Sequence, residues 1–520
     1  MHIEKVGANL DLVHCISLLQ LCTSRIKMMT LTEILESSYK KYPEKTAIFY
    51  KEKQIPYKQV YHQSRSLAAF LIDKGLRKGD RVGLIVKKNP DAIIAFLGIA
   101  QAGGVFYSVD YNQPDDSIQY TIDLTRPSFL VISSEFHDSL KTLNLRKHDT
   151  KVIIIGEESS DHFTWQEAIS FESKLGFDVK IENHDPVYLN FTSGSTGKPK
   201  GAVTTHDNLY WNTKSVVETF KFTHDDIHLC GFPIFTHPHE LFYRAFYTGG
   251  SLVLTDDFLP KTVTSAVVKH KVTCLMAISL IYENLLRYQS TATALSTLRV
   301  AESAGMHVDS DLIKSFKEKF NVNITAAWGS TETAGIALSN PIEGGKLDSI
   351  GIPCPYYETR IVDENGNDVD VNTIGEMIIK GRANITAYFD NEKESENLIK
   401  NGWLHTGDMV KKDPEGYFYF ISRKSRMIKV AGWKVYPSEI EEILASHPAV
   451  VECAVTKIYD PTLGELPKAV VVLQDKSAVS PGELRRYCSQ RTAKYKVPAV
   501  VEFVNALPKA PSGKILYQNL

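Results

Sequence analysis

The sequence predicts an α/β fold: a large N-terminal domain of two doubly wound α/β subdomains plus a small β element, followed by a small C-terminal domain. Three observations predict this. Short apolar runs alternate with segments of helical periodicity in two successive rounds, the first of which starts near residue 31. After residue 350 the apolar runs are separated by tight turns, and a polar cluster at 422–426 precedes the last hundred residues.

The first round reads as a largely parallel sheet. Residues 57–74 have helical periodicity, residues 81–86 form a strand-like run, and a helix over 90–102 is closed by two glycines. Further strands are predicted over 105–109, 129–132 and 152–155. Apolar strands separated by helices are typical of a parallel sheet that is covered on both faces.

The second round repeats this pattern. Strands are predicted over 251–254, 272–276, 298–301 and 324–328, with helices over 259–270 and 309–320. The short runs at 359–363, 375–379 and 417–421, with turns at 364–367 and 413–416, predict a small antiparallel element. Ser438 and Glu441 have the spacing of a capping box, which predicts a helix toward Leu444. The expected divisions are an extension over 1–30 that is poorly ordered, an N-terminal domain over 31–424 and a C-terminal domain over 425–520.

Composition excludes several classes of protein. The chain has 520 residues, 59 Lys and Arg against 61 Asp and Glu, and a net charge of −2, which argues against a nucleic-acid partner. The apolar stretch at 10–22 contains Asp11 and His14 and is too short to span a membrane. Seven cysteines are scattered without paired spacing, which favours reduced thiols in the cytoplasm over disulfides or a zinc site.

A run rich in hydroxyls and glycine follows the apolar strand end at 187–189. Small residues let successive backbone N–H groups face one point, and hydroxyls and lysines add donors and charge, so the run predicts a polyphosphate site. The alternative is a solvated surface loop. A Walker loop is excluded, because it would need glycine at position 192 and Ser or Thr at position 199. The predicted phosphate ligands are Thr192, Ser193, Gly194, Ser195, Thr196, Gly197, Lys198 and Lys200.

With this loop, four further motifs stand in a fixed order along the chain. They are the segments 303–305 (Ser-Ala-Gly), 326–333 (Ala-Ala-Trp-Gly-Ser-Thr-Glu-Thr), 403–408 (Trp-Leu-His-Thr-Gly-Asp) and 508–514 (Pro-Lys-Ala-Pro-Ser-Gly-Lys). The ordered set resembles the acyl-adenylate-forming superfamily, which comprises acyl-CoA synthetases, adenylation domains of peptide synthetases and luciferases. The Ser-Ala-Gly segment is most similar to that of benzoate-type CoA ligases. The resemblance covers residue 30 to the end of the chain and implies a mobile α+β C-terminal domain.

The resemblance also implies roles for individual residues. Trp328 stacks against adenine, Thr331 contacts phosphate, and Glu332 helps to hold magnesium. Asp408 binds the ribose hydroxyls. Lys514 is the catalytic cation of the first half-reaction. Thr192 is the expected second metal ligand, and the remaining nucleotide or CoA contacts are Ser303, Ala304, Gly305, Gly329, Ser330, Arg423, Lys429, Gly432 and Trp433.

The reaction that this implies uses ATP, Mg²⁺ and coenzyme A. A carboxylate attacks the α-phosphorus to give an acyl-adenylate, the C-terminal domain rotates about Ser425, and a thiol then takes the acyl group. A carrier protein in place of coenzyme A, and an inactive nucleotide-binding scaffold, stay as alternatives. Ser425 departs from the Asp or Lys that is usual at the hinge.

The expected acid is small, medium-chain or aromatic. Segment 232–240 lacks the aspartate that amino-acid-activating domains place there. His237 resembles the aromatic or histidine gate residue of many acyl-CoA synthetases, with Thr236 as the alternative at that position. Bulky Phe242, Tyr243 and Phe246 either shorten the acyl pocket or pack in the core, and Arg244 could meet a second polar group of the acid. A metal site at His237, His239 and Glu240 is disfavoured, because Pro238 interrupts the spacing.

Overall fold

The computed structural model of the chain describes residues 28–136, 142–156, 161–172, 179–193, 199–234, 236, 238–289, 292–461, 464–474, 479–509 and 515–520. Most of the expected N-terminal extension, up to residue 27, lies outside these ranges. Met28 and Met29 pack against the core, and the Thr30 hydroxyl caps helix α2 (Leu31–Lys41). Among the described helices, not one combines the length and the apolar character that crossing a membrane requires.

The first predicted subdomain is a seven-stranded sheet, parallel except for the last pair. Its strand order is β7 (Phe163–Thr164), β6 (Lys151–Ile155), β5 (Phe129–Ser133), β3 (Arg81–Ile85), β4 (Val105–Ser108), β8 (Pro186–Ser193) and β9 (Pro199–Thr205). The helices of this part of the chain are α3 (Tyr57–Asp73), α4 (Pro90–Gln101), α5 (Asp115–Thr125) and α6 (Trp165–Ile169). Apolar runs without alternation, such as the fully buried β5, are what burial on both faces requires.

The second subdomain is a nine-stranded sheet whose central strands are parallel. Its order is β16 (Ile352–Pro353), β15 (Gly335–Ser339), β14 (Ile324–Ser330), β13 (Val300–Ser303), β12 (Cys274–Ala277), β10 (Ile227–Cys230), β11 (Ser251–Leu254), β1 (Thr46–Tyr50) and β2 (Lys53–Pro56). The helices of this part are α7 (His206–Phe220), α8 (Pro238–Thr248), α9 (Pro260–His270), α10 (Ser279–Arg287) and α11 (Ser310–Phe320).

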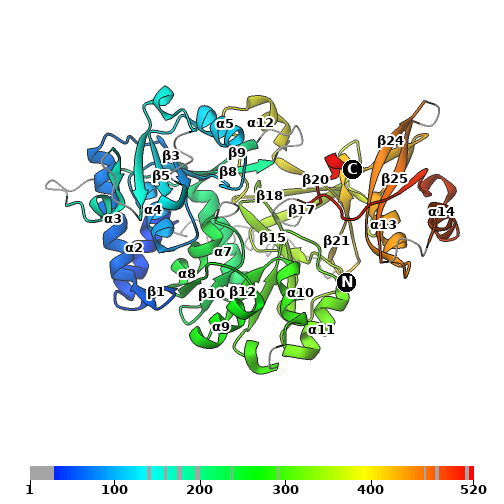
Figure 1. Ribbon diagram of the computed structural model, residues 1–520, viewed down its shortest axis with the longest axis horizontal. Helices are drawn as coiled ribbons and strands as arrows, with labels where there is room; N and C mark the ends of the chain where they lie inside the picture. The colour runs from blue at the N-terminus through cyan, green and yellow to red at the C-terminus, as the bar shows by residue number, and fades with distance from the viewer. Residues whose placement is uncertain are drawn as a thin grey trace, which may run out of the picture.

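One apolar core joins the two sheets. Helices α4, α7 and α8 all contribute residues to it (Figure 1). The rings of Phe96 in α4 and Phe242 in α8 stack with their centroids 5.9 Å apart. Phe242, Tyr243 and Phe246 are fully buried in this region. Phe246 packs edge-on against Tyr57. The full burial of all three side chains and the ring contacts of the two phenylalanines support the packing alternative.

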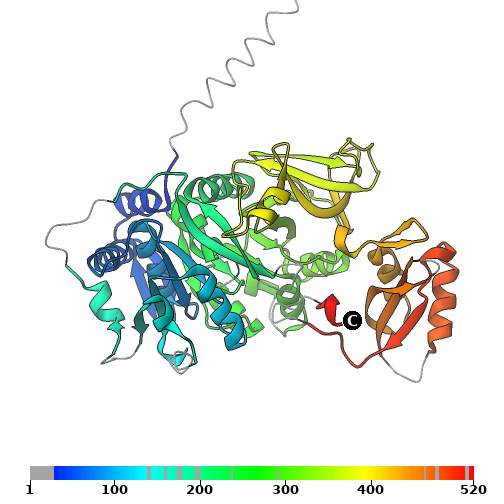
Figure 2. The same cartoon turned by 90° about the horizontal axis from the view of Figure 1, so that it is seen from above.

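The predicted antiparallel element and the C-terminal domain are also present. The former contains β17 (Tyr357–Val362), β18 (Gly375–Gly381), β20 (Trp403–Lys412), β19 (Ile399–Lys400) and β21 (Phe418–Arg423), with helix α12 (Glu392–Leu398). The latter contains β22 (Ile428–Val430), β23 (Trp433–Val435), β24 (Val450–Asp460), β25 (Gly464–Leu473) and β26 (Val500–Phe503), with α13 (Pro437–Ala445) and α14 (Pro481–Ser489). In both views this orange and red α+β unit stands beside the large domain (Figure 1, Figure 2).

The predicted capping box at Ser438 is wrong. Helix α13 begins two residues earlier than a cap at Ser438 would place it, with Tyr436 as N-cap and Pro437 in the first turn. The Ser438 hydroxyl instead donates to the Ile421 carbonyl at 2.5 Å, and Glu441 accepts a hydrogen bond from the Val455 N–H at 2.8 Å. Both side chains therefore make contacts between elements, which the spacing alone does not reveal.

Candidate active site

The carboxyl end of β14 meets the antiparallel element at Asp408. This aspartate is fully buried in β20 and lies opposite Arg423 of β21. Trp328 donates its indole N–H to Asp408 Oδ2 at 2.9 Å, and Arg423 Nε lies 2.8 Å from Oδ1. The structure thus brings together three residues that are distant in sequence: Trp328 lies 80 positions before Asp408, and Arg423 lies 15 positions after it.

The electrostatics of Asp408 are those of a buried acceptor. Burial raises the pKa of its carboxyl to about 6, although Arg423 and the Trp328 hydrogen bond both act to lower it. Despite the ion pair, Oδ1 has no hydrogen-bond partner within the described part of the chain. Buried acceptors are normally satisfied, so this oxygen has capacity for a hydroxyl donor from outside the protein.

A second unsatisfied polar atom lies at the end of β13. Ser303 is fully buried, and its hydroxyl also has no hydrogen-bond partner among the residues described. Ala304 and Gly305 continue the chain out of the sheet, and Gly305 adopts a positive φ of 82°. In an open parallel sheet ligands bind at the carboxyl ends of the strands, which is where Ser303 and Trp328 lie.

The turn after β14 presents Thr331 and Glu332. Its backbone is held tightly: a Cβ added at Gly329 would lie 2.4 Å from the carbonyl oxygen of Gly335, so only glycine fits there. Tyr388 donates its hydroxyl to Glu332 Oε1 at 2.7 Å. Burial and the neighbouring Glu332 raise the pKa of Tyr388, so this hydroxyl stays a donor.

The predicted phosphate loop lies only partly within the described residues. Strand β8 carries the backbone of Thr192 and Ser193 and pairs antiparallel with β9, Thr192 opposite Lys200. Residues 194–198, and the side chains of Thr192 and Ser193, lie outside what the structure describes. Lys200 forms an ion pair of 2.7 Å with Glu394 of α12.

The predicted CoA wall is the β22–β23 hairpin of the C-terminal domain. Trp433 is 63% exposed and stacks on Tyr495 with centroids 5.4 Å apart. Gly432 has a φ of 88° and open space where a side chain would be. Lys429 is exposed on the same hairpin. Lys514 and His237 lie outside the described residues.

The predicted hinge is bounded by two ion pairs. Ser425 lies in a short 3₁₀ turn, Lys424–Arg426. Lys424 Nζ lies 2.7 Å from Glu376 Oε2 in β18 of the large domain. Arg426 Nη2 lies 2.7 Å from Glu441 Oε1 in α13 of the small domain.

Sequence reasoning missed some of the site's supporting residues. Tyr388 lies 56 positions from Glu332, and no local pattern connects them. Arg244 is not free to meet an acid, since its guanidinium pairs with Glu240 at 3.0 Å and Glu302 at 2.7 Å. A signal for Glu302 was present, because it is a charged residue in an otherwise apolar strand directly before Ser303.

Comparisons with known proteins cover nearly the whole chain. The family model described as AMP-binding enzyme matches residues 35–389, and the model described as AMP-binding enzyme C-terminal domain matches residues 439–514. A feruloyl-CoA synthase of Amycolatopsis sp is 30% identical over 91% of this chain and 95% of its own length. A long-chain-fatty-acid–CoA ligase of Bacillus subtilis (strain 168) is 29% identical over 94% of each.

Solved structures agree with these matches. ATP-bound MatB from Rhodopseudomonas palustris superposes with a TM-score of 0.85 and 25% identity, covering 94% of this chain and 98% of that one. O-succinylbenzoate coenzyme A synthetase (MenE) from Bacillus subtilis, in complex with ATP and magnesium, gives a TM-score of 0.83 and 26% identity over 94% and 98% of the two chains. The large domain of sheets and the smaller C-terminal domain are thereby confirmed as the fold.

Proposed function

Since this chain belongs to the family of AMP-binding enzymes, we propose that its Asp408 clamps the ribose of ATP while a carboxylic acid is activated beside it. The activity that the relatives support is that of an AMP-forming acyl-CoA synthetase. The single observation that carries the site assignment is the fully buried carboxylate of Asp408, whose Oδ2 accepts from Trp328 and whose Oδ1 is ion-paired with Arg423 but accepts no hydrogen bond from the described residues. A carboxylate acceptor suits ribose hydroxyls, which are donors.

In the first half-reaction the acid's carboxylate attacks the α-phosphorus of ATP, and pyrophosphate leaves. Two anions must be aligned and the charge on phosphorus neutralised, so positioning and electrostatics carry the catalysis. Trp328 and Asp408 hold the nucleoside. Lys514 is proposed to bridge the carboxylate and phosphate oxygens as a compact cation.

Magnesium would be held by Glu332 with Thr192. A carboxylate and a hydroxyl are an all-oxygen donor set, which fits this hard cation, and the ion would neutralise phosphate charge when bound. Within the protein, the Tyr388 hydrogen bond fixes the orientation of the Glu332 carboxylate.

In the second half-reaction a thiol takes the acyl group and AMP leaves. We propose that residues 425–520 turn about Ser425, which withdraws Lys514 and presents Lys429, Gly432 and Trp433. Coenzyme A is the proposed thiol donor, and a phosphopantetheinylated carrier protein is the alternative. Comparing thioester formation with each thiol separates the two.

The remaining proposals concern the acid, the cellular location and the alternative of an inactive protein. The acid is proposed to be small, medium-chain or aromatic, and exclusive use of C16–C18 acids would contradict this. A cytoplasmic location is proposed from the scattered cysteines, and the five that the structure describes are all free. An inactive scaffold is the alternative from another class, and pyrophosphate release with any acid would exclude it.

The decisive experiment is Lys514→Ala, assayed in each half-reaction separately. Adenylate formation should be abolished, while thioester formation from synthetic acyl-AMP should be largely retained. Lys509→Ala is the matched control, since that lysine, five positions earlier, is ion-paired with Glu452 at 2.7 Å and has no proposed role in either step. Equal loss of both half-reactions in Lys514→Ala would refute the assigned role.

A further inference from the structure

Glu376 is a buried acid in an otherwise apolar part of strand β18. Burying a carboxylate is costly unless it is paired and hydrogen-bonded. Both oxygens of Glu376 have partners: Oε1 accepts the backbone N–H of Gly407 at 3.3 Å, and Oε2 lies 2.7 Å from Lys424 Nζ. The two partners come from separate segments of the chain, and each segment leads into a residue with a proposed role.

The first partner, Gly407, directly precedes the proposed ribose ligand Asp408. The pairing of β18 with β20 shifts register at this point, so that residues 406–408 face the single residue 377. Such a bulge re-aims side chains, and Gly407 supports it with a positive φ of 69°. The hydrogen bond from Gly407 to Glu376 therefore holds the bulge that places Asp408.

The second partner, Lys424, directly precedes the proposed hinge residue Ser425. Its side chain is 48% exposed, whereas that of Glu376 is 8% exposed. Although burial acts to raise the pKa of Glu376, the hydrogen bond and charge of Lys424 and the nearby His405 hold it below its usual value. The carboxylate therefore stays ionised and keeps its attraction for the ammonium group at the hinge.

Arg423 forms a second connection between the same two places. Its Nε lies 2.8 Å from Asp408 Oδ1, and its Nη1 donates to the Thr406 carbonyl at 3.1 Å. A ribose hydroxyl that donates to Oδ1 would compete with this ion pair. Because Arg423 is the neighbour of Lys424, occupation of the ribose site changes the forces on the backbone just before the hinge. The Glu376–Lys424 ion pair opposes any displacement of that backbone.

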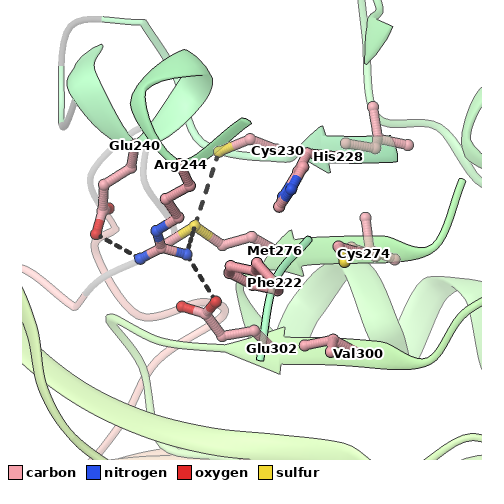
Figure 3. A pocket seen from close by; sticks show the side chains of 11 residues that line it. Phe222, His228, Cys230, Glu240, Arg244, Cys274, Met276, Val300 and Glu302 are labelled. Carbon is pink, nitrogen blue, oxygen red and sulfur yellow. Dashed lines mark hydrogen bonds and ion pairs between the residues drawn. The ribbon is translucent and has the colours of Figure 1, made fainter. Parts of the chain in front are cut away.

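Another buried acid in a strand is held differently. Glu302 of β13 shares Arg244 with Glu240 of α8, at 2.7 and 3.0 Å, and all three side chains are at most 5% exposed (Figure 3). That triad lies within the second subdomain and joins a helix to its own sheet. The cation of Glu376 instead belongs to the last residue before the hinge, so of these two strand acids it is Glu376 that connects a ligand site with the hinge.

We propose that Glu376 is a positioning residue that couples occupancy of the ribose site to the hinge. While both of its bonds are made, the bulge before Asp408 and the turn before Ser425 are held as one unit, so AMP binding steadies the hinge turn. Such coupling is reciprocal, and a steadied turn therefore also strengthens AMP binding. This inference rests on the proposed function, because it takes Asp408 as the ribose ligand and Ser425 as the hinge.

The test is Glu376→Gln, which keeps the shape of the side chain. Glutamate has two acceptor oxygens, each with its own partner here, whereas glutamine has one, so the variant can hold Gly407 or Lys424 but not both. Trypsin reports on the hinge turn directly, because it cleaves after lysine and arginine and the turn contains Lys424 and Arg426. In the wild type, saturating AMP should slow this cleavage at least about 5-fold. In Glu376→Gln, saturated according to its own titration, the ratio of the two rates should approach one.

Glu441→Gln is the matched control. Glu441 is bonded in the same manner, to the Val455 N–H at 2.8 Å and to Arg426 at 2.7 Å, but it lies in α13 on the small-domain side of the hinge. Its ratio of cleavage rates without and with AMP should therefore match that of the wild type. A purely structural role of Glu376 would speed cleavage with and without AMP alike and leave the ratio unchanged. Thermal melts report whether each variant is folded.

Lys424→Gln tests the coupling from the hinge side. It removes the ammonium group but leaves the hydrogen bond from Gly407 to Glu376, so cleavage after Arg426 should lose its dependence on AMP. A wild-type ratio in either Glu376→Gln or Lys424→Gln overturns the inference and leaves the acyl-CoA synthetase activity intact. It is also overturned if AMP binds the wild type without slowing cleavage. Failure of the wild type to bind AMP in a calorimetric titration would instead contradict the proposed function, and the inference with it.

Discussion

The assignment of Asp408 to the ribose predicts what its neutral isostere will do. In Asp408→Asn the amide oxygen must accept the Trp328 N–H, which lies 2.9 Å from the carboxylate in the wild type, so the NH₂ group takes the place of Oδ1. The acceptor that is ion-paired with Arg423 disappears, and a donor then faces both Arg423 and the ribose hydroxyls. A hydrogen bond to a charged group contributes about 1.5–3 kcal/mol, so AMP should bind about 10- to 150-fold more weakly.

Isothermal titration of AMP into the wild type and Asp408→Asn measures this directly. Burial already disfavours the charged form of Asp408, as its raised pKa of about 6 indicates, so the variant should remain folded in a thermal melt. Trp328→Phe is the control, because it keeps an aromatic ring and the whole carboxylate and should weaken AMP binding less. A folded Asp408→Asn protein that binds AMP with wild-type affinity would refute the reasoning.

Three further predictions concern supporting residues. Burial raises the pKa of Glu302 from 4.5 to about 7, so between these pH values the folded protein retains a proton that the unfolded chain releases. The free energy of unfolding of the wild type, measured in urea, should therefore fall relative to that of Glu302→Gln by about 1 kcal/mol per pH unit between pH 4.5 and 7. Parallel pH profiles of the two proteins would contradict this. Tyr388→Phe removes the 2.7 Å hydrogen bond to Glu332 and should raise the magnesium concentration for half-maximal activity several-fold with little change in stability, whereas an unchanged requirement would show that Tyr388 does not orient the carboxylate. The Tyr517 ring lies 3.5 Å from the Arg426 guanidinium, so Tyr517→Ala should slow adenylate formation more than Tyr517→Phe, which keeps the ring, and equal rates would exclude a role for this stacking.

Much of the fold could be predicted because local patterns agree with tertiary burial. The helix predicted over 57–74 is observed as Tyr57–Asp73, and the one over 309–320 as Ser310–Phe320 with Asp309 as its cap. Each segment has one apolar face and is followed by a polar C-cap residue, Lys74 and Asn321. Pairing is less local: strand β1 joins the second sheet, beside β11, although it precedes the first sheet in sequence. Periodicity reports which face is buried but does not identify the neighbouring strand.

The candidate site, like the fold, could be predicted from the sequence only in part. Trp328, Asp408 and Arg423 were identified from motifs, and the structure adds that they converge on one buried carboxylate. The Ser438 cap was predicted wrongly, since its hydroxyl bonds to a different element. The role of Arg244 could not be derived from sequence either, because its two partners come from its own helix and from a strand 58 residues away.

The contacts on either side of Ser425 have a mechanical consequence. Lys424, which precedes the serine, is ion-paired with the large domain, and Arg426, which follows it, is ion-paired with the small domain. Both ion pairs have a nitrogen–oxygen distance of 2.7 Å. Torsion between the two domains would therefore be concentrated in the backbone bonds of a single serine, and neither ion pair would have to break during the swing. Away from this axis, Lys434 of the small domain is ion-paired with Glu364 of the large domain at 3.1 Å. The swing would have to break this pair, so added salt, which screens it, should shift the balance away from the orientation described here.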